Sequence, residues 1–427
     1  MRIAIVGYGT AGQALAALLA QDDHQLDAFE RAPLLGPVGA GILLQPTGLW
    51  VLWQMGLLGE ALKYGAPVRR LFGDTATGRP VMDMHYAALD HRLAGLGMQR
   101  GALFQLLKSA WPDANKVRCG HDIVSISEDG RRLTDDAGER HGPYDLVVIA
   151  NGSASKLRDV MGPHRLNRPY PWGALWCLLP QGDWPHVADL RQRYRAARRM
   201  MGLLPVGSRP DNPDPQLSFF WSLPVARIER WREQGLAAWH EEASALWPEA
   251  APLLAHITDA GVLMQANYRD AVLKRWQRAP VVLIGDAAHA MSPQLGQGVN
   301  MALMDAMALQ GALRSQGRPE DALALYERER QAHAHIYQFW SRWLTPLFQS
   351  ERDMAAWLRD FTFIPMARLP ISRGQMLRVL TGTQKGWFGR LRLPSEFLDV
   401  LGSALADSTI EAATSPAQSF PLSVGSS

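Results

Sequence analysis

Four short apolar runs stand at wide intervals along the chain, at residues 3–6, 26–29, 146–150 and 281–284. Each run is rich in Val, Ile, Leu, Ala or Phe, and each ends at a glycine or a polar residue. Runs of this length with such borders are typical of strands that are buried on both faces of a parallel sheet. The pattern therefore predicts an α/β fold whose central strands come from distant parts of the chain.

Three glycines follow the first run and precede an Ala/Leu-rich segment of helical character. Gly7 permits a tight turn, Gly9 lets a pyrophosphate approach the backbone, and Gly12 lets the helix pack close to the strand. Glu30 ends the second run, eighteen residues after Gly12, where a carboxylate accepts hydrogen bonds from a ribose. A turn that serves packing alone leaves Glu30 unexplained, so the spacing predicts a dinucleotide site.

The fourth run delivers Asp286 at its carboxyl end, and a loop that contains Pro293 follows. After this loop, Gly298, Val299 and Asn300 open a segment of helical character. The first N–H groups of a helix have no partner within the helix, and they attract electron-rich ligands. We therefore expect Asp286 and this helix start to face the same ligand.

Together the two glycine motifs resemble those of the FAD-dependent aromatic hydroxylase family, the single-component flavoprotein monooxygenases built like para-hydroxybenzoate hydroxylase. The resemblance covers about residues 1–385 and includes the Asp-Leu-Val-Val-Ile-Ala-Asn-Gly run that ends at Gly152. It implies that Asp286 binds the ribityl chain of FAD and that the helix at Gly298 faces the flavin ring. Gly41 and Arg100 match further cofactor-binding positions of the family.

The resemblance also implies a reaction and a division of labour. NADH or NADPH reduces FAD, O₂ forms a flavin C4a-hydroperoxide, and one oxygen atom passes to a hydrophobic aromatic or conjugated small molecule. Since the cofactor carries this chemistry, no catalytic side chain is assigned, and no metal site is expected. The family usually has aspartate where this chain has Asn151, which keeps an acceptor but removes a charge. The choice between NADH and NADPH stays open.

The motifs predict a Rossmann-like FAD-binding domain that is interrupted by other segments. We assign residues 1–66, 97–160 and 276–313 to this domain, and residues 67–96 and 165–275 to an inserted, mainly β substrate domain. Residues 314–402 form a C-terminal helical region, and the serine-rich residues 403–427 form a flexible tail.

Composition and charge agree with a globular enzyme. The chain has 427 residues, 47% of them hydrophobic, and a net charge of +3, which does not call for nucleic acid. Two cysteines are too few for a disulfide framework and suit a reducing cytoplasm. The sequence contains no apolar run long enough for an ordinary transmembrane helix, and it leaves the oligomeric state undetermined.

Fifteen tryptophans are many for this length, and several fall in the inserted segment. If the run from Leu217 to Leu223 is a strand, Leu217, Phe219 and Trp221 share one face, and such a face would suit a flat aromatic substrate. Trp221 and Pro293 are therefore the candidate substrate contacts. His289 is expected to support its loop rather than to act as a base.

Three other functions remain open at this stage. A flavin-dependent halogenase shares the opening glycines, but its Trp-x-Trp-x-Ile-Pro signature is absent. A FAD-dependent reductase or dehydrogenase of the same fold would not insert oxygen. A non-catalytic flavin-binding partner protein is favoured slightly by Asn151.

Overall fold

The structure is a computed structural model that describes residues 1–36 and 39–414. Its first layer is a six-stranded sheet with the order β18-β19-β12-β1-β2-β8. The four apolar runs supply its centre, with parallel pairing of β2 to β1, β1 to β12 and β12 to β19. The strands are β1 (Arg2–Val6), β2 (Gln25–Glu30), β8 (Arg118–Cys119), β12 (Leu146–Ile149), β18 (Gln277–Arg278) and β19 (Val281–Leu283).

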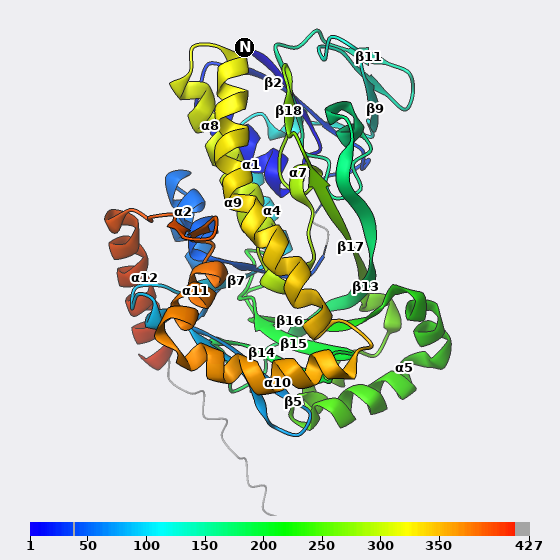
Figure 1. Ribbon diagram of the computed structural model, residues 1–427, viewed down its shortest axis with the longest axis vertical. Coiled ribbons are helices and arrows are strands. Elements are labelled where there is room, and N and C mark those ends of the chain that lie inside the picture. Colours follow the sequence, from blue (N-terminus) through cyan, green and yellow to red (C-terminus); the bar gives the residue numbers. More distant parts are fainter. Residues whose placement is uncertain (37–38, 415–427) are drawn as a thin grey trace, which may run out of the picture.

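Helices cover this sheet because its central strands are buried on both faces. Helix α1 packs against α4 and α8, and α8 packs against α9. In Figure 1 the long α9 runs from the six-stranded sheet down to the second sheet. The helices of this part are α1 (Thr10–Leu19), α2 (Pro46–Gln54), α3 (Leu58–Tyr64), α4 (Arg100–Ser109), α7 (Asp286–His289), α8 (Gly298–Ser315) and α9 (Pro319–Phe348).

The second layer is a seven-stranded sheet with the order β17-β13-β16-β15-β14-β5-β6. The strands β5 and β6, at one end of this order, come from the segment 67–96, and the other strands come from the insert of about residues 165–275. The strands β13 and β17 are long and extend from this sheet toward the first layer (Figure 1). The strands are β5 (Arg70–Thr75), β6 (Pro80–His85), β13 (His164–Pro180), β14 (Asp189–Arg195), β15 (Arg199–Pro205), β16 (Gln216–Pro224) and β17 (Met264–Leu273).

The seven-stranded sheet is covered on both faces. Leu217, Phe219 and Trp221 of β16 belong to the core shared with α5 (Ile228–Leu246) and α6 (Ala251–Leu254). Phe220 lies on the opposite face and packs with the end of α9 and with α10 (Asp353–Arg368). Figure 1 shows α5 and α10 at the lower end of the molecule, on either side of the sheet.

Smaller sheets and further helices complete the fold. One three-stranded sheet contains β3 (Gly41–Leu44), β7 (Gly95–Gln99) and β4 (Ala66–Val68), and another contains β11 (Arg140–His141), β10 (Leu133–Asp135) and β9 (Ile123–Ile126). The C-terminal region continues with α11 (Pro370–Leu380), the hairpin β20 (Gln384–Lys385) and β21 (Gly389–Arg390), and α12 (Ser395–Thr414).

The predicted α/β class, with an inserted mainly β part and a C-terminal helical region, is confirmed. The exact domain boundaries stay a prediction. The predicted start of the tail at residue 403 is wrong, because α12 continues to Thr414, and residues 415–427 lie outside the described residues. None of the helices within residues 1–36 and 39–414 is long and apolar enough to cross a membrane.

Candidate flavin site

The turn after β1 has the geometry that the glycine spacing predicts. Gly7 has a φ of +98°, and a Cβ there would lie 2.6 Å from the Cα of Asn151. A Cβ on Gly12 would lie 2.0 Å from the carbonyl oxygen of Gly7, so close packing excludes any side chain. At Gly9, by contrast, no atom lies within 4 Å of such a Cβ. The backbone is therefore open at the position where a pyrophosphate must approach.

Glu30 lies at the end of β2, beside this turn. Its carboxylate accepts hydrogen bonds from the backbone N–H groups of Tyr8, at 2.9 Å, and Ala32, at 3.0 Å. The N–H of Gly7 donates to the carbonyl of Phe29, at 2.8 Å, which joins the turn to the same strand end. Glu30 is thus fixed at the edge of the sheet where a ribose would meet it.

Asp286 and the start of α8 lie together, as the fourth run predicts. Asp286 is exposed at the carboxyl end of β19, and one of its carboxylate oxygens lies 3.9 Å from where a Cβ of Gly298 would be. Gly298 is also exposed, and it is the first residue of the eighteen-residue helix α8. The amino end of α8 therefore opens beside Asp286, and Val299 follows within its first turn.

Two of the predicted cofactor residues have side chains or backbone groups committed elsewhere. The Asn300 side chain is buried, accepts from the N–H of Gln45 and donates to the carbonyls of Leu43 and Gly296. The N–H of Gly41 donates to Ser218 Oγ at 3.0 Å. A Cβ on Gly41 would lie 2.4 Å from the Cβ of Ser218, so this glycine lets β3 pack against β16. Both residues shape the walls of the site.

Arg100 is the first residue of α4 and directly follows β7. Burial lowers the pKa of its guanidinium, while the nearby Asp286 and Tyr268 raise it. Gly39 lets the chain pass the arginine, because a Cβ there would lie 2.8 Å from Arg100 Cδ. The backbone N–H of Arg100 donates to the carbonyl of Ala40, at 2.8 Å, whereas its guanidinium forms no hydrogen bond or ion pair with the other described residues. A cofactor phosphate or hydroxyl suits such a cation.

Arg158 was not predicted from the sequence, yet it connects the two loops of the site. It is fully buried and donates to the carbonyls of Gly152, Ser153 and Asp286, at 3.2, 2.8 and 3.1 Å. Burial lowers its pKa to about 10. It lies in a short 3₁₀ segment (Leu157–Met161) that carries no recognisable motif, so no signal in the sequence identifies it.

Asn151 provides a test of whether a ligand fits here. Its side-chain oxygen is buried beside Gly7 and has no hydrogen-bond partner among the described residues. A buried acceptor without a donor is costly, and a bound group that offers a donor would satisfy it. With the open backbone at Gly9 and the fixed Glu30, this unpaired oxygen fits the presence of a dinucleotide cofactor.

The predicted substrate role of Trp221 is wrong. Leu217, Phe219 and Trp221 do share a face, but that face packs against α5, and Trp221 is 1% exposed. Strand β16 is buried on both faces, so alternation of apolar and polar residues could not indicate which face lies toward the cofactor. Ser218 and Phe220 occupy the face that lies toward β3 and the end of α9.

An aromatic group lies on that face instead. The indole N–H of Trp176 donates to the hydroxyl of Tyr268 at 3.1 Å, and the rings of Trp176 and Phe220 are 5.0 Å apart. Burial raises the pKa of Tyr268 to about 12, so its hydroxyl is protonated near neutral pH. Because Tyr268 also influences Arg100 electrostatically, this aromatic group adjoins the candidate flavin site.

His289 supports its loop, as expected from the sequence. Its Nε2 lies 2.6 Å from Asp305 Oδ2, and Arg330 Nε donates to the other oxygen at 2.7 Å. Asp305 also accepts from the N–H of Gly285 at 2.7 Å. Burial opposes ionisation of Asp305, but the charges of His289 and Arg330 outweigh it and hold its pKa at about 2. This buried network fixes α7 to α8 and α9.

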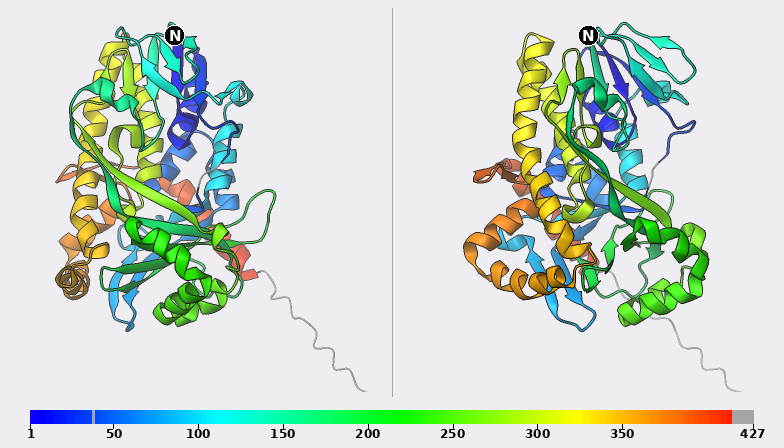
Figure 2. Two further views of the ribbon diagram at one scale, coloured as in Figure 1. Left: turned by 90° about the vertical axis from the view of Figure 1, so that its right-hand side faces the viewer. Right: turned by 45° about the vertical axis from the view of Figure 1, so that its right-hand side comes forward.

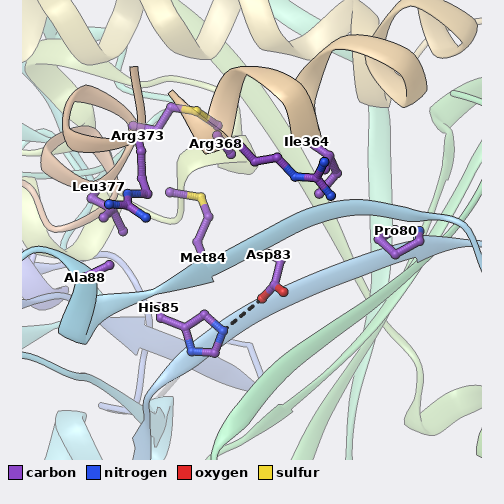
Figure 3. Close-up of a pocket in the computed structure, with 11 residues that line it drawn as sticks. Pro80, Asp83, Met84, His85, Ala88, Ile364, Arg368, Arg373 and Leu377 are labelled. Atoms are coloured by element: carbon purple, nitrogen blue, oxygen red, sulfur yellow. Dashed lines mark ion pairs between the residues drawn. The ribbon is translucent and has the colours of Figure 1, made fainter. Parts of the chain in front are cut away.

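Two other features lie apart from this site. A cavity of about 400 Å³ lies between β6 and the helices α10 and α11, with Asp83 and His85 on one side and Arg368 and Arg373 on the other (Figure 3). His121, Asp135, Glu139 and His141 gather at the sheet of β9 to β11, a grouping that sequence spacing does not indicate. Both histidines there contact the same oxygen of Asp135, so hydrogen bonds within the protein account for the cluster.

Comparison with known proteins gives the context of this site. Residues 1–338 match the family described as FAD binding domain. The 2-heptyl-3-hydroxy-4(1H)-quinolone synthase of Pseudomonas aeruginosa is 29% identical, over 90% of this chain and 98% of its own. Kynurenine 3-monooxygenase of Salinispora arenicola is 31% identical, over 78% of this chain and 77% of its own.

Solved structures share the fold. Klebsiella pneumoniae HpxO complexed with FAD and uric acid has a TM-score of 0.75 at 22% identity, and the match covers 90% of this chain and 97% of that chain. A 2-methyl-3-hydroxypyridine-5-carboxylic acid oxygenase has a TM-score of 0.73 at 24% identity, with 90% and 99% covered. The chain belongs to the FAD binding domain family and, within it, to the FAD-dependent aromatic hydroxylases, which makes it a FAD-dependent monooxygenase.

Proposed function

We propose that this enzyme uses NADH or NADPH and O₂ to insert one oxygen atom into a hydrophobic aromatic or conjugated small molecule. Bound FAD would accept the hydride and activate the oxygen. The protein would bind FAD, orient the substrate and exclude water. The observation that carries the substrate class is the aromatic group of Trp176, Phe220 and Tyr268 beside the half-buried Arg100.

The residues would divide the work between cofactor and substrate. Gly7, Gly9, Gly12 and Glu30 would hold the adenosine and pyrophosphate half of FAD, because the turn is open only at Gly9. Asp286 and Arg100 would hold the ribityl and phosphate groups. The amino end of α8, at Gly298 and Val299, would stabilise negative charge on the flavin ring.

The substrate would lie between this helix start and the aromatic group. Pro293 begins the short 3₁₀ turn (Pro293–Leu295) that leads into α8, which keeps it a candidate contact. The Tyr268 hydroxyl already accepts a hydrogen bond from Trp176, so its own proton is available to a substrate oxygen or nitrogen. The names of two relatives contain aromatic compounds, kynurenine and a heptyl quinolone, which supports a planar substrate of this kind.

The deciding experiment measures ¹⁸O incorporation from ¹⁸O₂ with NADH or NADPH and a panel of phenols, quinolones and indoles. We expect a labelled product and consumption of nicotinamide in the same reaction. Flavin reduction without any labelled product would favour a reductase, and no reduction with either nicotinamide would favour a flavin-binding partner protein.

A substitution links this reaction to the aromatic group. Tyr268→Phe keeps the ring but removes the hydroxyl, so we expect a higher KM or more nicotinamide consumption without product. Tyr64→Phe, at the half-exposed tyrosine that ends α3, is the matched control and should leave both unchanged. Equal effects of the two substitutions would remove Tyr268 from the substrate site.

A further inference from the structure

Helix α10 has apolar side chains on both of its sides. Ala356, Arg359 and Phe363 form its buried face against the rest of the protein. On the opposite face, exposed apolar residues follow the spacing of a helical stripe. They are Met354, Trp357, Leu358 and Phe361, and the exposed Leu369 directly follows the end of the helix.

The stripe continues onto neighbouring elements. Ile371, in the first turn of α11, is 87% exposed, and Phe388, at the tip of the β20–β21 hairpin, is 98% exposed. Trp387 of this hairpin lies 4.8 Å from the ring of Phe339 on α9. In both views of Figure 2 the orange segment with α10, α11 and the hairpin lies along one edge of the molecule. We call this surface, with the residues named here, the apolar edge.

From residue 361 onward the charges along the apolar edge have one sign, while the acidic residues Asp353 and Asp360 of α10 form ion pairs with Arg198 and Arg359. Between residues 361 and 395 the chain has six basic residues and no acidic residue. Within the described residues, none of the six takes part in an ion pair, although the chain has many ion pairs elsewhere. They are Arg368, Arg373, Arg378, Lys385, Arg390 and Arg392.

We propose that the apolar edge docks this enzyme onto the surface of an anionic phospholipid bilayer. Apolar side chains that protrude among unpaired cations are the combination that binds such a surface, since the side chains enter the headgroup region and the cations meet the phosphates. A symmetric contact with a second copy is disfavoured, because it would bring the same unpaired cations of both copies together. A bilayer supplies the negative charge that the protein itself lacks here.

The proposal is tested by flotation of the FAD-loaded full chain with vesicles. We expect binding to vesicles that contain phosphatidylglycerol, little binding to pure phosphatidylcholine, and release at high salt. Arg373→Gln with Arg390→Gln should lower the partition coefficient by about fivefold for each charge removed. Ile371→Ser with Phe388→Ser should also lower it several-fold without changing the FAD content.

Matched controls lie away from the apolar edge. Val124→Ser, on β9, and Arg230→Gln, on α5, replace an exposed apolar side chain and an exposed cation elsewhere, and both should leave binding unchanged. Equal loss in controls and edge variants would overturn the proposal. Absence of binding to the vesicles that contain phosphatidylglycerol would also overturn it. An oligomer that dissociates on Ile371→Ser with Phe388→Ser would overturn it too, because it would identify a second copy as the occupant.

Discussion

Asp286 is exposed and lies beside the first residue of α8, so a substitution of its side chain tests the proposed cofactor site directly. Asp286→Ala removes an acceptor for the cofactor, and we expect FAD binding to weaken by about 1–3 kcal/mol, roughly five- to 150-fold. Titration of the apoprotein with FAD measures this change. Asp183→Ala, at an exposed aspartate before β14, should leave the affinity unchanged. An unaltered affinity in the first variant would show that Asp286 does not meet the cofactor.

Arg158 acts on the same site through backbone carbonyls. Arg158→Ala removes its hydrogen bonds to Gly152, Ser153 and Asp286, so the two loops lose their connection. We expect at least a tenfold rise in the Kd for FAD, since hydrogen bonds to a charged group contribute about 1.5–3 kcal/mol each. Circular dichroism checks that the fold is retained. If the folded variant binds FAD as tightly as before, Arg158 serves packing alone.

The residues of this site also show how far single functional positions could be predicted from the sequence. Gly7, Gly9, Gly12 and Glu30 stand at spacings whose mechanical reason is local, and the structure gives them that geometry. Arg158 depends on contacts between segments far apart in the chain, so no local pattern indicates it. Asn300 lies at a recognisable position, yet its side chain is committed to Gln45 and Leu43.

At the scale of elements, the network of Asp305 joins α8 to the loop after β19 and to α9. Asp305→Asn leaves Arg330 buried without its counter-charge, and we expect a loss of about 3–5 kcal/mol in the free energy of unfolding. Urea unfolding near neutral pH measures this loss. Asp321→Asn, whose carboxylate pairs with Arg318 at the surface, should change stability by about 0.5 kcal/mol or less.

The pH dependence of this loss follows from the depressed pKa of Asp305. Its folded pKa of about 2 lies below the ordinary value of about 3.9, so the folded protein releases this proton more readily than the unfolded chain. The stabilisation is therefore complete above about pH 4 and disappears as the pH falls through about 2. The difference between the wild type and Asp305→Asn should narrow over that range, and a constant difference would contradict this role.

Elements were predicted most accurately where one pattern allows one structure. The runs of β1, β12 and β19 are continuous and apolar, and they form the centre of the sheet. Strand β16 is also apolar throughout, but its two faces meet different partners, and this choice depends on where α5 and α9 pack. Residues 403–414 are rich in Ala and Ser, and their composition did not reveal the helix α12.

The strands β13 and β17 connect the two layers of the molecule, and they pair with each other along most of their length. Cys177 of β13 is 2% exposed, and burial raises the pKa of its thiol to about 12. In a Cys119→Ser background, which leaves one thiol, labelling of Cys177 therefore requires the seven-stranded sheet to open. FAD binds only the folded site, so it should slow this labelling if both layers unfold as one unit. Labelling at the same rate with and without FAD would show that the substrate sheet opens independently of the cofactor layer.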